Sequence, residues 1–287
     1  MSESIEPAPE SQPPRSSRHF APEPDPGFVE RFGGRARAMF EHFGHAGRMT
    51  AGAMASLFRR PFEVRAIVYQ FEALGVKSLS IAIITAIFTG MVMAVQFAYG
   101  LQRFGGMEYT GRIVGISFSR ELAPTLTAVI VGGRIAAGIA AELGSMNVTE
   151  QIDAVRSLGA DPLKKLVMPR IIACTLVMPI LCAFALVLGF SGAMFITSVE
   201  FNIPAKFFLT TALGAVQFRD LYSGMYKTPV YGAIIAIVGC HFGMTTRNGT
   251  EGVGHSTTAA VVATSISVLI ADFFLTKISL ELWPAMF

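Results

Sequence analysis

The sequence predicts an all-α integral membrane protein, with an interfacial amphipathic helix followed by five transmembrane helices. Hydrophobic residues make up 52% of the 287 residues and charged residues only 15%, whereas about a quarter of a typical soluble domain is charged. The mean hydropathy is +0.52. The apolar residues are gathered in segments that approach the thickness of a bilayer, which indicates membrane spans.

The chain before the first span divides into two parts. Residues 1–27 predict a disordered cytoplasmic tail, because they are rich in proline and lack the apolar region of a signal peptide. Residues 28–77 are expected to lie on the membrane surface. Phenylalanines and arginines occur together up to Arg60, and a helical apolar pattern follows Pro61. A basic linker is the alternative before Pro61, and the helix after it is expected to turn into the first span near residues 75–78.

Spanning a hydrocarbon core of about 30 Å takes roughly 20 apolar residues. By this measure five spans are predicted, at residues 79–97, 113–133, 171–199, 230–246 and 259–275. The third contains Pro179, so a tilt or kink is expected there. Basic residues are most numerous before residue 78 and after the second span, which places the N-terminus in the cytoplasm. The C-terminus, with Trp283 as an interfacial anchor, is then expected on the opposite side.

The second span carries an adjacent charged pair, Arg120 and Glu121. Arg120 follows Arg112 by eight residues, which puts it about 12 Å below the outer boundary. A lone charge at this depth costs about 3 kcal/mol or more, so both side chains are expected to face protein or a wet cavity. They either line a functional cavity or form structural ion pairs, for which Asp272 in the fifth span is a candidate. Arg134 is expected to snorkel to the inner headgroups.

Small residues follow in two adjacent ribbons with a period of four. The ribbons are Gly132, Ala136, Ala140 and Gly144, and beside them Gly133, Ala137, Ala141 and Ser145. Small side chains let helices approach closely in lipid. The ribbons therefore predict either a tight contact inside the chain or a subunit interface.

The loop between the second and third spans predicts a short amphipathic helix. Asn147 and Glu150 have the spacing of a capping box, and Gly159 is expected to end the helix. Asp161 followed by Pro162 is expected to start a second short helix. The loop helix is suited to docking in the groove of a partner or to lying on the membrane, and both alternatives remain open.

The residue pattern does not support an enzyme or a metal protein. Cys174, Cys182 and Cys240 lie in apolar runs, and no metal-ligand spacing stands out. His241 and His255 are single histidines that are expected to be structural. The sequence has no Gly-Lys dipeptide and therefore no Walker A loop, so no cofactor is expected and ATP hydrolysis would have to come from a partner. The basic residues form no stripe for nucleic acid.

One stretch carries a family resemblance: "SRELAPTLTAVIVGGRIAAGIAAELGSMNVTEQIDAVRSLGADPLKKLVMPR". It closely resembles the MlaE/YrbE/TGD permease family, the membrane subunit of MCE-type ABC lipid transporters. The charged motif, the ribbons, the loop and the order of the spans agree with this family from about residue 61 to residue 282. Ala123 departs from the glycine of some relatives, and the Pro-rich extension is not typical of short members.

The resemblance implies a homodimer with five spans per subunit, formed by a permease domain at residues 78–287. Two ATPase subunits would grip the loop helix from the cytoplasm, an MCE-domain protein would sit on the outer face, and phospholipid would bind between the two permease copies. The residues implied to bind substrate are Arg120, Glu121 and Lys227. Those implied to contact the ATPase are Glu150, Gln151, Asp153, Arg156 and Leu158.

The function expected from this resemblance is that of a non-catalytic subunit of an ABC transporter in the bacterial inner membrane. It would move phospholipids between that membrane and an MCE-domain carrier, which associates it with the lipid asymmetry of the outer membrane. Two other functions remain open. An ion- or proton-coupled secondary lipid carrier would use Glu121 and Asp272 as proton sites. A membrane anchor would only recruit partners, which leaves the buried charges unexplained.

Overall fold

The computed structural model describes residues 44, 47–52 and 64–282. In these ranges the chain is built from helices joined by short turns and contains no strand, so the all-α prediction is confirmed for them. The predictions for residues 1–27, for most of the surface segment before residue 64 and for Trp283 lie outside the described residues.

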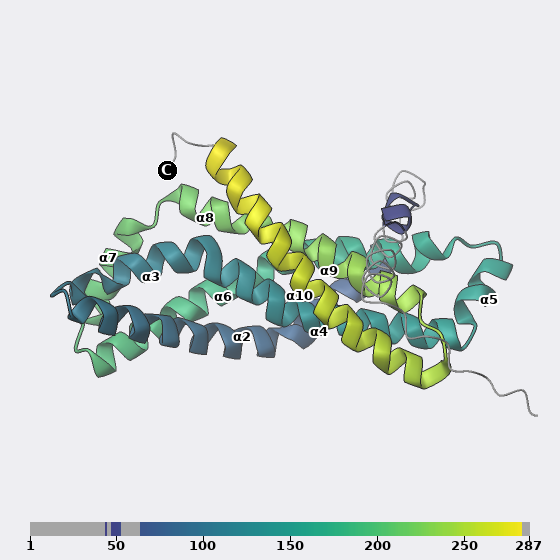
Figure 1. The fold of residues 1–287 in the computed structure, drawn as a ribbon, viewed down its shortest axis with the longest axis horizontal. Helices are drawn as coiled ribbons and strands as arrows, with labels where there is room; N and C mark the ends of the chain where they lie inside the picture. The colour runs from purple at the N-terminus through teal and green to yellow at the C-terminus, as the bar shows by residue number, and fades with distance from the viewer. Residues whose placement is uncertain (1–43, 45–46, 53–63, 283–287) are drawn as a thin grey trace, which may run out of the picture. The chain divides into compact units, whose positions relative to one another are not determined.

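Among the described residues, four helical segments are long and apolar enough to cross a membrane, and they contain four of the five predicted spans. The first is α2 (Val64–Gln102). The second joins η1 (Met107–Tyr109), α3 (Thr110–Ser117), the π-helical turn η2 (Phe118–Leu122) and α4 (Ala123–Val148). The third joins the π-helical turn η3 (Leu163–Val167) and α6 (Met168–Glu200), and the fourth lies in α10 (Gly249–Leu282). α2, α4 and α6 run side by side, and α10 crosses α4 obliquely (Figure 1).

The predicted span at 230–246 corresponds to α9 (Lys227–Met244), which is not among these four segments. Its 18 residues measure about 27 Å, slightly less than a hydrocarbon core of roughly 30 Å. Only Tyr226, itself in a helical conformation, separates α9 from α8 (Phe218–Met225). A membrane crossing at this place would therefore need both helices.

The expected turn near residues 75–78 is wrong, because α2 is one helix through this region. Gly75 and Ser78 serve packing instead, and Ser78 is fully buried. Every fourth residue of α2 is buried, and from Ser78 onward this row consists of small residues: Ser78, Ala82, Ala86, Gly90, Ala94 and Ala98. The row packs against α6, so it is a helix-packing ribbon that was not recognised in the sequence.

The first ribbon of α4 packs inside the chain. A side chain added at Gly132 would meet Ile235 of α9, and one added at Gly239 of α9 would meet the backbone of Ala136. The second ribbon faces α10 at Gly133, which lies next to Val261. The alternative of an intramolecular contact is thus confirmed for the first ribbon. Pro179 lies inside α6 without ending the helix.

The loop helix exists as α5 (Gln151–Ser157), but its start differs from the prediction. Asn147 belongs to α4 and donates its amide to the carbonyl of Thr246, while Glu150 adopts a left-handed conformation with φ of 60° and no side-chain cap. The proposed capping box is therefore wrong. Gly159 ends the segment with φ of +77°, as expected. Asp161 accepts a hydrogen bond from the amide of Leu163, but the helix that follows is the start of the long third segment.

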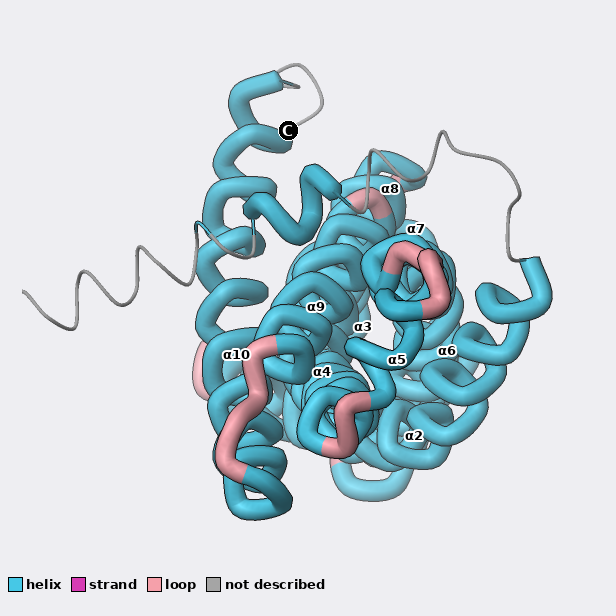
Figure 2. The backbone as a smooth tube through the Cα atoms, turned by 90° about the vertical axis from the view of Figure 1, so that its right-hand side faces the viewer, coloured by secondary structure: helices cyan, strands magenta, loops and turns pink. Residues whose placement is uncertain are grey.

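α5 and α7 (Ala205–Ala215) lie at opposite ends of the helix bundle (Figure 1). Viewed from the α5 end, α9 and α4 lie between α10 on one side and α6 and α2 on the other (Figure 2). α7 packs on α3, and α8 packs on the turn η2. The charged residues of the second span therefore lie where α8, α9 and α10 meet η2.

The seam between α2 and α6 can be tested at Gly90. A side chain added there would meet the backbone of Gly189, which cannot move aside, so Gly90→Ala is expected to destabilise the protein by about 1–3 kcal/mol. Gly138→Ala in α4 is the matched control, because nothing lies within 4 Å of the added methyl group. Thermal unfolding in detergent should show a lower Tm for the first variant only. Equal Tm values would contradict this account of the seam.

Candidate functional site

The segment that contains Arg120 and Glu121 is a π-helical turn. The amide of Ala123 donates to the carbonyl of Phe118, five residues earlier, instead of the four of an α-helix. Pro124 explains this wider turn, since proline has no amide hydrogen to donate to the carbonyl of Arg120 and its ring would clash with that carbonyl. π-helical turns are frequent at functional sites.

α8 approaches this turn closely because of one glycine. A side chain added at Gly224 would collide with the carbonyl of Ser119 and would lie 3.1 Å from the ring of Pro124. α8 is also held by Asp220, which caps its N-terminus through a hydrogen bond of 2.8 Å from the amide of Gln217. The other carboxylate oxygen of Asp220 lies 2.7 Å from Nε of Arg120.

Glu121 belongs to a second ion cluster, which is centred on Lys227 at the start of α9. The Lys227 side chain is completely buried, and its Nζ lies 2.8 Å from both carboxylate oxygens of Glu121. Nζ also lies 3.2 Å from Asp272 and 2.7 Å from the hydroxyl of Thr276, both on α10. The hydroxyl of Tyr231, one turn further along α9, donates to Asp272 over 2.6 Å. These five residues are called the lysine cluster below.

The lysine cluster satisfies a charge that could not be buried alone. Removing an ammonium group from water costs several kcal/mol, and this cost is recovered only when charges and hydrogen bonds surround the group. Lys227 has two carboxylates and a hydroxyl around it, so the formal charge of the cluster is −1. Glu121 keeps 39% of its side-chain surface exposed and Asp272 keeps 18%. The cluster therefore presents acceptor oxygens outward and keeps its cation inside.

The structure brings two of the three predicted substrate residues together and separates the third. Glu121 and Lys227 are in direct contact. Asp272 was expected to pair with Arg120 or Glu121, but its ion-pair partner is Lys227. Arg120 points to Asp220 on α8, and 27% of its side chain is exposed. Asp220 was not identified as a partner because its helix was read as part of an outer loop. The Gln217 and Asp220 spacing of a capping box was the available signal.

Arg170 and Glu142 form another ion pair, near the α5 end of the bundle. Nη2 of Arg170 lies 2.8 Å from Glu142 of α4, and the arginine side chain is only 3% exposed. Its Nη1 donates to the carbonyl of Leu166, inside the π-helical turn η3. This turn also precedes a proline, Pro169, as η2 precedes Pro124. Arg134 donates to Ser78 of α2, a contact that snorkelling alone did not predict.

The residues predicted to contact an ATPase are exposed. Glu150, Gln151, Asp153, Arg156 and Leu158 all have exposed side chains, whereas Ile152 is buried and anchors α5. Leu158 is 86% exposed, which is unusual for a large apolar side chain. Asp153 and Arg156 form an exposed ion pair with each other on α5, in which Nη1 of Arg156 lies 2.8 Å from Oδ1 of Asp153.

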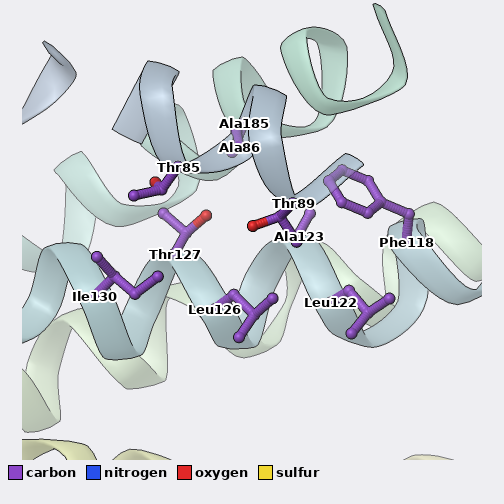
Figure 3. A pocket seen from close by; sticks show the side chains of 10 residues that line it. All are labelled: Thr85, Ala86, Thr89, Phe118, Leu122, Ala123, Leu126, Thr127, Ile130 and Ala185. Atoms are coloured by element: carbon purple, nitrogen blue, oxygen red, sulfur yellow. The ribbon is translucent and has the colours of Figure 1, made fainter. Parts of the chain in front are cut away.

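A small cavity lies beside η2, between α2, α4 and α6 (Figure 3). Its volume is about 10 Å³, which is room for about one water molecule. The side chains of Thr89 and Thr127 point toward one another across it (Figure 3). This cavity is too small for a lipid. Within the described residues, no group of three or more His, Cys, Asp or Glu side chains is placed to hold a metal ion.

The lysine cluster makes a prediction about stability. Lys227→Met leaves Glu121 and Asp272 without their common cation, which is expected to cost about 3–5 kcal/mol. The control is Lys277→Met, because Lys277 forms an exposed pair with Glu281 on α10 and its loss is expected to cost less than about 1 kcal/mol. Thermal unfolding of the two purified variants should separate them clearly. Adding Glu121→Gln and Asp272→Asn to Lys227→Met should restore part of the lost stability. Equal Tm values for Lys227→Met and Lys277→Met would contradict the role of the cluster.

The chain is similar to known permeases. The family described as Permease MlaE matches residues 67–278. A probable ABC transporter permease protein of Synechocystis sp. is 43% identical over 206 residues, which cover 72% of this chain and 78% of the relative. Protein TRIGALACTOSYLDIACYLGLYCEROL 1, chloroplastic, of Arabidopsis thaliana is 39% identical over 213 residues, which cover 74% of this chain and 61% of the relative. A probable ABC transporter permease protein of Rickettsia typhi is 37% identical over 226 residues, covering 79% and 87%.

The matched region contains η2, the lysine cluster, Asp220 and α5. Its helices include all four segments that are long and apolar enough to cross a membrane, apart from short stretches at their ends. The chain is therefore a multi-pass membrane protein that belongs to the MlaE family of ABC transporter permeases.

Proposed function

We propose that this permease moves phospholipids between the bacterial inner membrane and an MCE-domain carrier, powered by a separate ATPase subunit. The observation that carries the proposal is that two ion clusters meet at η2, between α4, α8, α9 and α10 of an ABC permease. They are the Arg120–Asp220 pair and the lysine cluster. Ionised groups inside membrane segments are expensive and mark substrate pathways. The Arabidopsis relative bears the name of a diacylglycerol lipid, which supports a glycerolipid as the substrate class.

The exposed parts of the two clusters suit the headgroup of a lipid. Arg120 offers donors for a phosphate, and Glu121 offers acceptors for an amine, while both remain partly exposed. Lys227 is completely buried and surrounded by oxygens, so its role is to hold Glu121 and set the charge of the site. Arg120 and Glu121 are thus the residues that contact the substrate, and Lys227 is a positioning residue.

A homodimer with five spans per subunit supplies the space that the lipid needs. α8 and α9 together form the fourth crossing in chain order, joined at Tyr226, whose hydroxyl donates to the carbonyl of Leu275 on α10. α10 exposes a long apolar face, including Ile266, Phe273 and Phe274. A second copy and lipid tails cover this face, next to the two clusters. The N-terminus lies in the cytoplasm, as the distribution of basic residues predicts.

Coupling to the ATPase runs through α5. A cytoplasmic ATPase binds the exposed face of this helix, with Leu158 as the apolar anchor and Asp153 and Arg156 at the rim. α4 connects α5 with η2 as one helix of 26 residues, about 39 Å long. Movement of α5 therefore reaches Arg120 and Glu121 through a continuous helix, which Arg170 fastens to the start of α6.

The proposal is tested with the complex extracted gently from its own membrane. Native mass spectrometry is expected to find two copies of this chain, two ATPase subunits and bound phospholipid. After reconstitution, ATP should drive the transfer of fluorescent phospholipid to the MCE-domain protein. Arg120→Ala and Glu121→Ala should each slow this transfer about tenfold or more, as the loss of a charge-assisted hydrogen bond predicts.

Arg103→Ala and Glu72→Ala are the matched controls, because both residues are exposed and lie outside the clusters. They should transfer lipid at the rate of the unchanged complex. An unchanged rate of lipid transfer in Arg120→Ala and Glu121→Ala would show that the clusters do not lie on the lipid pathway. Transfer driven by a pH gradient in vesicles containing only this chain would instead favour the secondary carrier.

The role of α5 is tested with two apolar residues of equal exposure at opposite ends of the bundle. Leu158→Asp is expected to weaken binding of the ATPase at least about tenfold, as the loss of an apolar anchor of about 2 kcal/mol implies. Phe104→Asp is the control, since Phe104 is also 86% exposed. The measurement is the amount of ATPase that co-purifies at increasing salt. Equal retention by both variants would contradict docking through Leu158.

A further inference from the structure

A second pocket lies between the η1–α3 segment and α7. These elements lie at the end of the bundle opposite α5 (Figure 1). Its volume is about 390 Å³, which is within the range of sites for small ligands. One wall is formed by Glu108, Tyr109 and Arg112, and the other by Phe207, Thr210 and Thr211. The pocket belongs to neither ion cluster of η2.

The walls of this pocket are fixed by close helix packing. A side chain added at Gly111 would lie 2.8 Å from the carbonyl of Phe208, and one added at Gly115 would lie 3.2 Å from the carbonyl of Ala212. These two glycines let α3 and α7 touch along their backbones, and Phe208 is buried in the contact. Glu108 and Arg112 are therefore held opposite α7 by regular helices.

The two charges of the pocket have opposite sign but do not pair. Glu108 and Arg112 are four residues apart, a spacing at which opposite charges on a helix commonly interact. Both side chains are exposed, and neither forms an ion pair within the described part of the chain. The pocket thus offers one cation and one anion side by side, with a formal charge of zero.

The threonines add acceptors on the side of α7. The hydroxyl of Thr210 donates to the carbonyls of Lys206 and Phe207, and that of Thr211 donates to those of Phe207 and Phe208. Their protons are thus used within α7, while their lone pairs remain able to accept. Together with the Glu108 carboxylate they suit an ammonium group with N–H donors. The Arg112 guanidinium offers only donors and suits a phosphate.

We propose that this pocket binds the zwitterionic headgroup of a phospholipid of the phosphatidylethanolamine class. Arg112 binds the phosphate, and Glu108 with the two threonine hydroxyls binds the ammonium group. An anionic headgroup is disfavoured, because it would place a net negative charge beside Glu108. Tyr109 and Phe207 are 54% and 40% exposed, and aromatic side chains of this kind are enriched where headgroups meet acyl chains.

This inference deepens the proposed function and rests on it. The pocket would hold a lipid by its headgroup at the surface opposite α5, before or after the lipid meets Arg120 and Glu121. It thereby adds a second site for the combination of phosphate and amine that Arg120 and Glu121 also suit.

The test uses the full chain with its partners, reconstituted in vesicles of equal parts phosphatidylethanolamine and phosphatidylglycerol. A photo-crosslinking phenylalanine analogue replaces Gly214, which lines the pocket and has nothing within 4 Å of an added Cβ atom. The same analogue in place of Leu213, which is 66% exposed and does not line the pocket, is the control. Mass spectrometry then identifies the adducts.

The expected result is at least about tenfold more phosphatidylethanolamine than phosphatidylglycerol bound at position 214, with no such preference at 213. Arg112→Gln should remove the adduct, and Glu108→Gln should remove the preference. Equal labelling by both lipids, the same preference at position 213, or a peptide adduct from a protein partner would each overturn the proposal.

ATP-driven transfer by the unchanged complex is measured in the same vesicles. Transfer without a phosphatidylethanolamine adduct would sink this inference and leave the proposed function standing. Absence of transfer from vesicles that contain both ATPase and carrier would instead count against the proposed function.

Discussion

The burial of Lys227 is the constraint on which the arrangement of the site depends. An ammonium group with no exposed surface must be surrounded by oxygens, and these come from two segments that are far apart in the sequence. Glu121 comes from η2, while Asp272 and Thr276 come from successive turns of α10. Their convergence on one nitrogen sets the position of α10 against α9 and of both against η2. Small residues along α4 and α9 then let the helix axes come close enough for these short side chains to meet.

Pro124 determines how the neighbouring charges are divided. Adjacent residues of a helix already point about 100° apart. The wider turn before the proline also takes Arg120 and Glu121 out of line with the side chains of the α-helical part of α4. Glu121 is directed to α9 and α10, whereas Arg120 is directed to α8. The packing of Gly224 on the carbonyl of Ser119 keeps α8 in place, and Asp220 both caps α8 and accepts from Arg120. One proline thus lets a single helix contribute to two separate ion clusters.

The sequence predicted the long apolar helices well because lipid solvent imposes their length and composition. It also predicted that Arg120 and Glu121 need partners. Asp272 was the candidate because another charge in a span is rare, but it pairs with Lys227. Asp220 was missed because it lies in a short amphipathic helix that reads as a loop when hydropathy alone is considered. The small-residue row of α2 was missed because single alanines are common, and only the position of α6 shows which face of α2 they share. The false capping box at Asn147 and Glu150 has a related cause: α4 continues past Asn147, whose amide is taken by Thr246 of a distant turn.

The two π-helical turns, η2 and η3, lie at the two ends of the segment formed by α4 and α5. Each precedes a proline by two residues, so each leaves a backbone carbonyl that an α-helical amide cannot reach. In η3 this carbonyl belongs to Lys165, four residues before Pro169. The Arg170 guanidinium donates to the neighbouring carbonyl of Leu166 and also binds Glu142. The segment from η2 to η3 comprises α4 and α5, and it is held at one end by the Glu121 and Arg120 contacts and at the other by Arg170. Because a long helix is stiff while a wider turn interrupts the regular hydrogen-bond pattern, displacement of this segment would concentrate at its two turns. One of these turns, η2, carries the residues proposed to meet the substrate, and only Thr149 and Glu150 separate α4 from the exposed loop helix α5.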